Sequence, residues 1–341
     1  MKKRDEILKK VEEWKKKRRE EKNKEKSLPG GHILASGGLD SSLRVWSLRD
    51  GKEVKKLNNG QIYSLDWHPK RNVVALGTGE KTVEVWDIEQ GTLNIKFKEH
   101  SSFVNSIQWE EKGERFASAA GDGTARIWHP SKGSVAVLRG HNDYLLTEVV
   151  WINSEEVVTS AMDKTIKVWS VTEEKETDEI RVQKKKGIIS RKTLSPTSLA
   201  WNRKEELLAV GTMEGDIQVL DSNWKRIEEL HNAHNGPVSS LQFNRAGNLL
   251  LSGAFDSFTK VWRVKKGVFD LDSGETEPLE KKLAKHGGSV YSVGWSYDGK
   301  WVASSGEDAS IVVWDTQEWS AVDIRGHRFA VLAFSIRPSR T

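Results

Sequence analysis

The chain has 341 residues, with 54 lysines and arginines, 49 aspartates and glutamates, and a formal net charge of +5. It contains 15 tryptophans and no cysteine, which excludes disulfide frameworks, thiol catalysis and cysteine-based zinc sites. No apolar run approaches the roughly 18 residues of a membrane span, and the first residues lack the apolar segment of a secretory signal. We therefore expect a cytoplasmic or nuclear protein without membrane contact.

The N-terminal segment, residues 1–27, differs from the rest of the chain in charge. It holds 13 basic and 7 acidic residues, so the remainder carries a net charge of −1. Residues 2–26 contain neither Pro nor Gly and are rich in Lys, Glu and Arg, which predicts a basic N-terminal α-helix. Its apolar residues form a narrow stripe of Ile7, Leu8, Val11 and Trp14. The helix either docks on the following domain, pairs with a partner helix, contacts RNA or another acidic surface, or is solvated.

From residue 32 onward the sequence repeats with a period of about 41 residues. In each unit, one alternating strand ends at Trp46, Trp86, Trp128, Trp169, Leu220, Trp262 or Trp314. A second aromatic series precedes the last six of these by 18 or 19 residues, at Trp67, Trp109, Trp151, Trp201, Phe243 and Trp295. An apolar stretch lies between the two series, and Gly, Asp, Asn and Pro separate the strands. This pattern predicts four strands in each unit.

The repeat resembles the WD-repeat β-propeller family over residues 32–337. The Trp-Asp and Gly-His pairs of that family stand at Trp86-Asp87, Trp314-Asp315, Gly140-His141 and Gly326-His327. The resemblance implies an all-β fold, a seven-bladed β-propeller of four-stranded antiparallel blades. We expect this propeller to occupy residues 32–341, after a linker at residues 28–31.

The resemblance also implies a hydrogen-bonded chain of histidine, hydroxyl, aspartate and tryptophan in most blades. The five expected sets are His327, Ser36, Asp40 and Trp46; His100, Ser118, Asp122 and Trp128; His141, Thr159, Asp163 and Trp169; His234, Ser252, Asp256 and Trp262; and His286, Ser304, Asp308 and Trp314. Blades 2 and 5 have Leu76 and Val210 in the hydroxyl position, so an apolar replacement is expected there. A catalytic Ser–His–Asp reading is disfavoured, because an enzyme needs one asymmetric pocket and not five repeated sets.

By the same resemblance, two positions in each blade face the mouth of the central channel on one side of the ring, which we call the top. Several of these positions hold apolar residues or tyrosines, although folding does not require them there. We call the following set the top rim: Leu39, Tyr63, Met162, Met213, Phe255, Tyr291 and Glu307. The set predicts a partner-binding surface. The alternative is that these side chains fill the channel mouth and contact only one another.

Two long intervals between the tryptophans predict insertions. After Trp169, an outer strand near residues 178–183 precedes a basic loop on the top face, with Lys184, Lys185, Lys186, Arg191 and Lys192. This loop is either a site for an acidic peptide or phosphate, or a solvated and flexible segment. After Trp262, the outer strand is placed at residues 279–286, which leaves the extra residues on the bottom face.

Ring closure is predicted from the two ends of the repeat region. Blade 1 begins at residue 32 with a second-strand pattern and has no inner strand before it. Residues 329–336 match the missing inner strand, with Phe334 in its aromatic position. This C-terminal strand is expected to join blade 1, because closure removes exposed sheet edges and brings His327 to Asp40.

The favoured function is a non-enzymatic protein–protein interaction scaffold that binds a peptide or domain of a partner on the top rim. One alternative is a subunit of a ribonucleoprotein complex that contacts RNA through the basic helix and loop 184–192. Another is an engineered or stabilised propeller scaffold without an evolved ligand. No cofactor and no metal are expected. The partner's identity cannot be deduced, because this fold hosts many functions.

Overall fold

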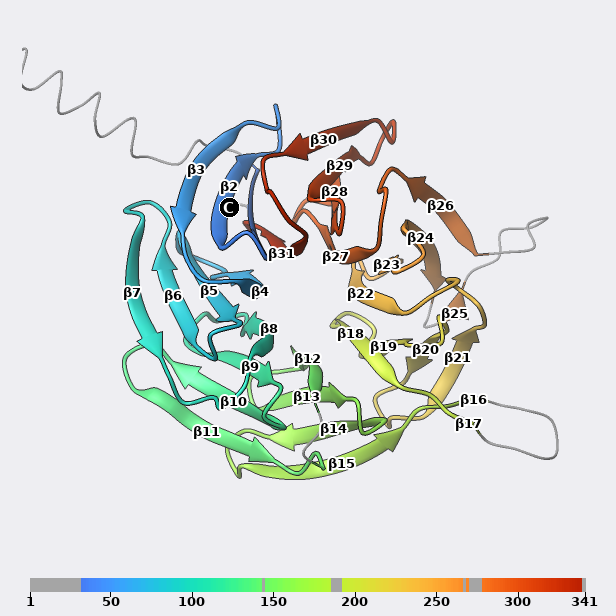
Figure 1. The fold of residues 1–341 in the computed structure, drawn as a ribbon. Helices are drawn as coiled ribbons and strands as arrows, with labels where there is room; N and C mark the ends of the chain where they lie inside the picture. Colours follow the sequence, from blue (N-terminus) through green and yellow to red (C-terminus); the bar gives the residue numbers. More distant parts are fainter. Residues whose placement is uncertain (1–31, 143–144, 185–191, 266–267, 270–277, 339–341) are drawn as a thin grey trace, which may run out of the picture.

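The computed structural model describes residues 32–142, 145–184, 192–265, 268–269 and 278–338. These residues form seven antiparallel sheets arranged as blades around a central channel (Figure 1). The seven-bladed, all-β propeller predicted from the repeat is thereby confirmed. The predicted helix within residues 1–27 and the linker at residues 28–31 lie outside the described residues, so the proposed domain division stays a prediction.

The strands of the first four blades follow one another from the channel outward. Blade 1 contains β31 (Val331–Ile336), β1 (Ile33–Gly38), β2 (Ser42–Ser47) and β3 (Glu53–Asn58). Blade 2 contains β4 (Ile62–Trp67), β5 (Val73–Thr78), β6 (Val83–Asp87) and β7 (Thr92–Phe97). Blade 3 contains β8 (Val104–Trp109), β9 (Phe116–Ala120), β10 (Thr124–His129) and β11 (Gly133–Arg139). Blade 4 contains β12 (Leu146–Trp151), β13 (Glu156–Ala161), β14 (Thr165–Ser170) and β15 (Lys175–Arg181).

The last three blades have the same order, with two small additions. A hairpin of β16 (Gln183–Lys184) and β17 (Lys192–Thr193) precedes blade 5. Blade 5 contains β18 (Pro196–Asn202), β19 (Leu207–Thr212), β20 (Ile217–Leu220) and β21 (Arg226–Leu230). Blade 6 contains β22 (Val238–Phe243), β23 (Leu249–Ala254), β24 (Phe258–Lys265) and β26 (Leu279–Ala284), with β25 (Val268–Phe269) on the end of β24. Blade 7 contains β27 (Val290–Trp295), β28 (Trp301–Gly306), β29 (Ser310–Asp315) and β30 (Ala321–Arg325).

The C-terminal strand closes the ring, as predicted. β31 pairs antiparallel with β1 and supplies the channel-side strand of blade 1 (Figure 1). The predicted register is wrong by two residues, because Ile336 and not Phe334 takes the place of Trp67 in blade 2. The strand therefore begins at Val331, and Phe334 packs beside Gly294 of blade 7.

Two outer strands are shorter or earlier than expected. β15 ends at Arg181 and does not reach residue 183, because Val182 is buried and its carbonyl accepts a hydrogen bond from the Leu194 N–H (2.9 Å). β26 begins at residue 279 as predicted but ends at Ala284, two residues before His286 turns towards Asp308.

The strands differ in burial as their sequences require. The second strand of each blade is a short apolar run and is buried on both faces, as in β1, whose six residues are all buried. The outer strands carry charges and remain largely exposed, as in β3. Neighbouring blades share their apolar clusters, since Trp67 of blade 2 packs with Ile33 and Val45 of blade 1. Hydrophobic burial thus holds each blade to the next around the ring.

The inner strands share a β-bulge near the top of the channel. In β4, Ile62 pairs with Thr78 and Ser64 pairs with Gly77, so Tyr63 is the extra, unpaired residue. The bulged residues of the other six inner strands are Asn105, Thr147, Thr197, Ser239, Tyr291 and Leu332. The bulge therefore presents one residue per blade at the same level of the channel.

Candidate functional site

The turn on the top face is held by a hydrogen-bonded chain of four side chains in blades 1, 3, 4 and 6, and by His286, Ser304 and Asp308 in blade 7. In blade 3, His100 lies 2.8 Å from Asp122 through Nδ1 and 2.7 Å from Ser118 through Nε2. The Trp128 indole N–H donates to the same Ser118 hydroxyl (2.8 Å). This arrangement places the histidine proton on Nδ1, so that Nε2 accepts from the hydroxyl.

The histidine, hydroxyl and carboxylate of the other predicted sets come together in the same way, while the place of Trp314 in the blade 7 set stays a prediction. The histidine-to-hydroxyl distances are 2.7 Å for His327–Ser36, 2.7 Å for His141–Thr159, 2.7 Å for His234–Ser252 and 2.6 Å for His286–Ser304. The histidine-to-carboxylate distances are 2.9 Å for His327–Asp40, 2.9 Å for His141–Asp163, 3.0 Å for His234–Asp256 and 3.0 Å for His286–Asp308. Indole N–H donors reach the hydroxyl from Trp46, Trp169 and Trp262.

In blades 1, 4 and 6, the electrostatics favour a neutral imidazole beside an ionised carboxylate, because burial lowers the pKa of His327, His141 and His234. Burial lowers the pKa of His234 and outweighs its hydrogen bond to Asp256. Burial alone would raise the pKa of Asp256, but the hydrogen bond and charge of His234 lower it to about 2. All five hydroxyls are fully buried, with 0% exposure, so none can reach a substrate. The chains tie a turn to two strands, which is a structural role.

Blades 2 and 5 contain polar substitutes that the sequence reasoning missed. In blade 2, the buried Glu84 carboxylate accepts from the Trp86 indole (2.9 Å) and the Thr82 hydroxyl (3.1 Å), and it pairs with Lys96 (2.7 Å). In blade 5, the buried Asp216 carboxylate accepts from the Asn232 N–H (2.8 Å). The expected apolar replacement is confirmed at the hydroxyl position itself, where Leu76 and Val210 are buried, but a polar network that was not expected lies beside each.

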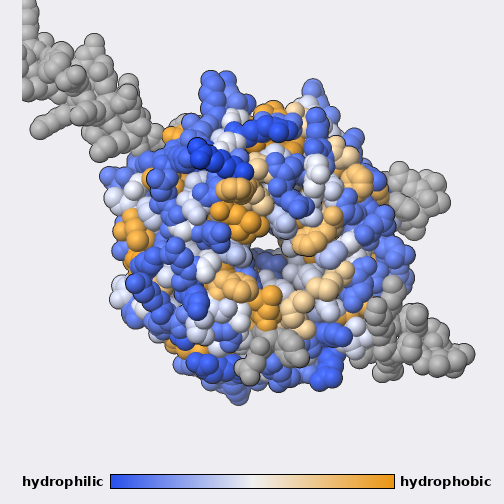
Figure 2. All heavy atoms as spheres, viewed as in Figure 1, coloured by the Kyte–Doolittle hydropathy of each residue, from blue (hydrophilic) through white to orange (hydrophobic). Residues whose placement is uncertain are grey.

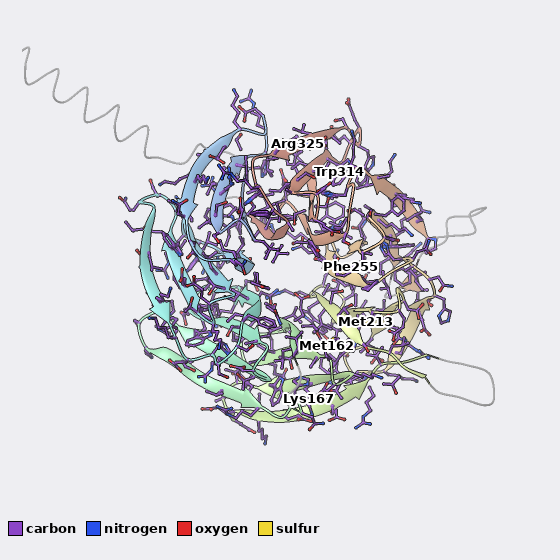
Figure 3. All side chains as sticks on the ribbon, viewed as in Figure 1. Met162, Lys167, Met213, Phe255, Trp314 and Arg325 are labelled. Carbon is purple, nitrogen blue, oxygen red and sulfur yellow. The ribbon has the colours of Figure 1, made fainter. Side chains whose placement is uncertain are left out.

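The top-rim residues lie around the mouth of the channel. Figure 3 places Met162, Met213 and Phe255 on the channel side of blades 4, 5 and 6. Phe255 is 47% exposed and Met213 is 39% exposed, while Leu39, Tyr63, Met162 and Tyr291 are half-buried and Glu307 is exposed. Figure 2 shows hydrophobic side chains gathered around the opening.

Some top-rim residues form aromatic pairs, while other apolar side chains of the rim stay exposed to solvent. The rings of Phe255 and Tyr291 meet edge to face, with centroids 5.6 Å apart. Tyr63 stacks on Phe103 at the same centroid distance. Some of the mutual contacts expected for a filled channel mouth are therefore present, while Phe255 and Met213 keep large exposed areas and the partner-binding surface stays a prediction.

Two phenylalanines of this face were not singled out from the sequence. Phe329 is 61% exposed and lies in the loop that carries His327, beside Ala330, whose carbonyl accepts from the Leu39 N–H (3.1 Å). Phe103 precedes β8 and forms the stack with Tyr63. The correct register of β31 would have identified this loop, because counting four residues back from Ile336 gives Leu332 as the bulged residue and leaves Phe329 and Ala330 before the strand.

The predicted basic loop falls mostly outside the described residues. Lys185, Lys186 and Arg191 lie outside them, and the backbones of Lys184 and Lys192 pair in the β16–β17 hairpin. Its role as a binding site stays a prediction.

One cluster of described residues has the composition of a metal site. A ligand atom from each of Asp216, Glu229 and His231 lies within 4.8 Å of the others. Glu229 already accepts hydrogen bonds from Gln218 (2.8 Å) and Arg226 (2.9 Å). The nearby guanidinium opposes a bound cation, so the cluster is better explained as an ion-pair network of blade 5.

Comparisons with known proteins agree with the ring. The family model "WD domain, G-beta repeat" matches residues 26–47, 132–170 and 277–315. The model "Anaphase-promoting complex subunit 4 WD40 domain" matches residues 40–110 and 199–270.

In the part of the chain that the structure describes, no helix has the length and apolar character needed to cross a membrane.

Several curated proteins are similar to this chain. The anaphase-promoting complex subunit cdc20 of Dictyostelium discoideum is 29% identical over 58% of this chain and 36% of its own length. Protein tipD of the same organism is 26% identical over 78% of this chain and 42% of its own length. The probable cytosolic iron-sulfur protein assembly protein 1 of Eremothecium gossypii is 38% identical over 30% of this chain and 31% of its own length. The chain thus spans less than half of each of these relatives. With the seven-bladed ring, these matches show that the chain belongs to the WD-repeat family of β-propellers.

Proposed function

We propose that this protein is a non-enzymatic interaction scaffold that binds a peptide or domain of a partner protein on its top rim. The observation that carries the proposal is the exposed apolar surface around the channel mouth, formed by Met213, Phe255 and Phe329. Folding alone does not account for it, because apolar clusters between the blades already bury the core side chains. Exposed apolar residues that gather in one place mark interaction surfaces.

The composition of the rim supports a protein partner. Tyr63 and Tyr291 combine an apolar ring with a polar hydroxyl, and methionine adapts to irregular partner surfaces. The relatives point the same way by name, since one is a subunit of the anaphase-promoting complex. A cytoplasmic or nuclear location belongs to the same proposal, and another relative is named as cytosolic.

The test is affinity purification with quantitative mass spectrometry, comparing the native chain with the double variant Phe255→Ala, Tyr291→Ala. Each side chain is expected to contribute on the order of 2 kcal/mol if it is a hot spot, so partners should be depleted at least tenfold. The control variant is Leu93→Ala, Val322→Ala, which removes exposed apolar side chains from the outer strands β7 and β30. Equal capture by the rim variant and the native chain, with both folded, would refute the proposal.

A further inference from the structure

The upper half of the channel is a polar cavity of about 350 Å³. Its lining includes the bulged residues Tyr63, Asn105, Thr147, Thr197, Ser239 and Tyr291. Below them lies a second level of side chains from the same strands, and Figure 2 shows the channel open at its centre. A side chain that enters from the top rim would therefore meet hydroxyl and amide groups.

Most blades use a serine at the second level to bridge to the next blade. Ser64 accepts from the Ile107 N–H (2.8 Å), Ser106 from the Val149 N–H (3.2 Å) and Ser240 from the Val293 N–H (3.2 Å). These bonds join β4 to β8, β8 to β12 and β22 to β27 around the channel.

Glu148 occupies the same position in β12 of blade 4. One of its carboxylate oxygens accepts from the Leu199 N–H of blade 5, at a longer distance of 3.4 Å. A serine performs this bridging in blades 2, 3 and 6, so the bridge itself does not require a carboxylate. Glu148 therefore adds to the cavity an ionisable carboxyl group that the bridge does not need.

No cation among the described lining residues pairs with this carboxyl group. The other ionisable groups that line the cavity are Tyr63, Tyr291 and Arg203, and the Arg203 guanidinium pairs with Glu111. Burial raises the pKa of Glu148 to about 8, against weaker opposing hydrogen bonds from Leu199 and Ser106. A ligand cation in the cavity would stabilise the ionised form.

We propose that Glu148 receives a cationic side chain, a lysine ammonium or arginine guanidinium, that the partner inserts into the channel from the top. This inference rests on the proposed function, because it gives the chemistry of the partner that the top rim holds. The methylene stem of such a side chain would contact the apolar rim, while its charged end pairs with the carboxylate. Pairing in a site sheltered from water is stronger than at an exposed surface.

The experiment titrates n-butylammonium, as a model of the lysine side chain, into the full chain and follows binding by NMR. The native chain should bind it at pH 9 at least tenfold more tightly than at pH 6, because Glu148 is ionised at the higher pH. Glu148→Gln should weaken binding at pH 9 at least tenfold and remove the pH dependence. Glu148→Ser, which introduces the bridging serine of blades 2, 3 and 6, should do the same. Glu155→Gln, on the bottom side of the same blade, is the matched control, and 1-butanol is the neutral probe.

The outcomes separate this inference from the proposed function. Equal binding of butylammonium by the native chain and Glu148→Ser, or no saturable binding at pH 9, would overturn the cation site whatever the rim does. Binding that depends on Glu148 would support the site even if partner capture is insensitive to Phe255 and Tyr291, which would refute only the proposed rim. Glu148→Ser keeps a bridging hydroxyl, so the test does not depend on the stability of Glu148→Gln.

Discussion

Blades 2 and 3 hold the same turn with different side chains. In blade 3, the His100 ring lies between Ser118 and Asp122, and Ala120 leaves room for it. Blade 2 has Thr78 at the position of Ala120, and its hydroxyl lies 2.7 Å from the Thr82 hydroxyl across the turn. Blade 5 repeats this arrangement, with Thr212 accepting from the Asp216 N–H (3.1 Å).

The comparison shows that a small residue and a histidine go together in this fold. The position of Thr78 and Thr212 holds glycine or alanine in the five blades with a histidine: Gly38, Ala120, Ala161, Ala254 and Gly306. A Cβ added at Gly306 would lie 3.0 Å from Nδ1 of His286, which shows how little space the ring leaves. Where the histidine is missing, the threonine hydroxyl satisfies the turn, and the buried polar groups keep partners in either case.

The largest effect is expected in blade 1, because its histidine and its inner strand both come from the C-terminal end of the chain and one truncation removes both. A chain that ends at Arg325 loses β31 and His327, which leaves the β1 edge and the Ser36 hydroxyl without these partners. We expect loss of cooperative unfolding in thermal denaturation, since burial of a whole strand is removed. A chain ending at Pro338 should unfold cooperatively, and cooperative unfolding of the shorter chain would contradict the role of closure.

Glu84 tests whether the substitute network of blade 2 stabilises as the histidine networks do. Glu84→Gln leaves Lys96 without its buried partner and weakens two hydrogen bonds, which should cost about 2 kcal/mol of unfolding free energy. Glu80→Gln is the control, because Glu80 is exposed and its carboxylate lies farther from the Lys96 ammonium, at 3.8 Å. Its cost should stay below about 0.5 kcal/mol in urea denaturation. Equal effects would show that Glu84 is not the centre of the network.

The sequence predicted the parts of this fold that repeat. Seven registered strand-end positions, six tryptophans and Leu220, are enough to count the blades and to pair a histidine with a distant aspartate, as for His327 and Asp40. The predicted register of β31 is wrong because it matches Phe334 to the aromatic position of the other inner strands. In blade 3, that position lies nine residues after the histidine, from His100 to Trp109, and the same spacing leads from His327 to Ile336. Spacing from the network was the more reliable guide, since that network is fixed by hydrogen bonds.

The substitute networks and the exposed Phe329 were harder to predict. Thr78 and Thr212 were visible in the sequence, because the same position holds glycine or alanine in the five blades with a histidine. What this difference means depends on the space that the histidine ring fills in those five blades. The exposure of Phe329 depends on how two loops from opposite ends of the chain meet. The charge of Glu148 could be read from the sequence, but its place within the channel follows from the bulge in β12.

The carboxylates of the turns and those of the channel should respond to pH in opposite directions. The lowered pKa of Asp256 contributes stability that is lost as pH falls from about 4 towards 2. Burial raises the pKa of Asp66 to about 6, despite hydrogen bonds from Trp109 and Ser335, so its ionisation costs stability as pH rises from about 4 through 6. Asp66→Asn should therefore gain on the order of 1 kcal/mol relative to the native chain between pH 4 and pH 7.5. A constant difference in urea denaturation at the two pH values would contradict this assignment.

The smallest effect on stability is expected from removing residues 1–26, whose net charge of +6 contrasts with the −1 of the rest of the chain. The described blades form a closed ring whose apolar clusters are built from residues 33–336. We expect the deletion to change the melting temperature by no more than about 2 °C, as for a loss below about 0.5 kcal/mol. The formal charge would change from +5 to −1, so weak, salt-sensitive binding to a polyanion such as heparin should disappear. Differential scanning calorimetry measures the first effect, and a much larger drop in melting temperature would instead place Trp14 in the core. Heparin affinity measures the second, and polyanion binding that survives the deletion would direct attention to Lys184 and Lys192.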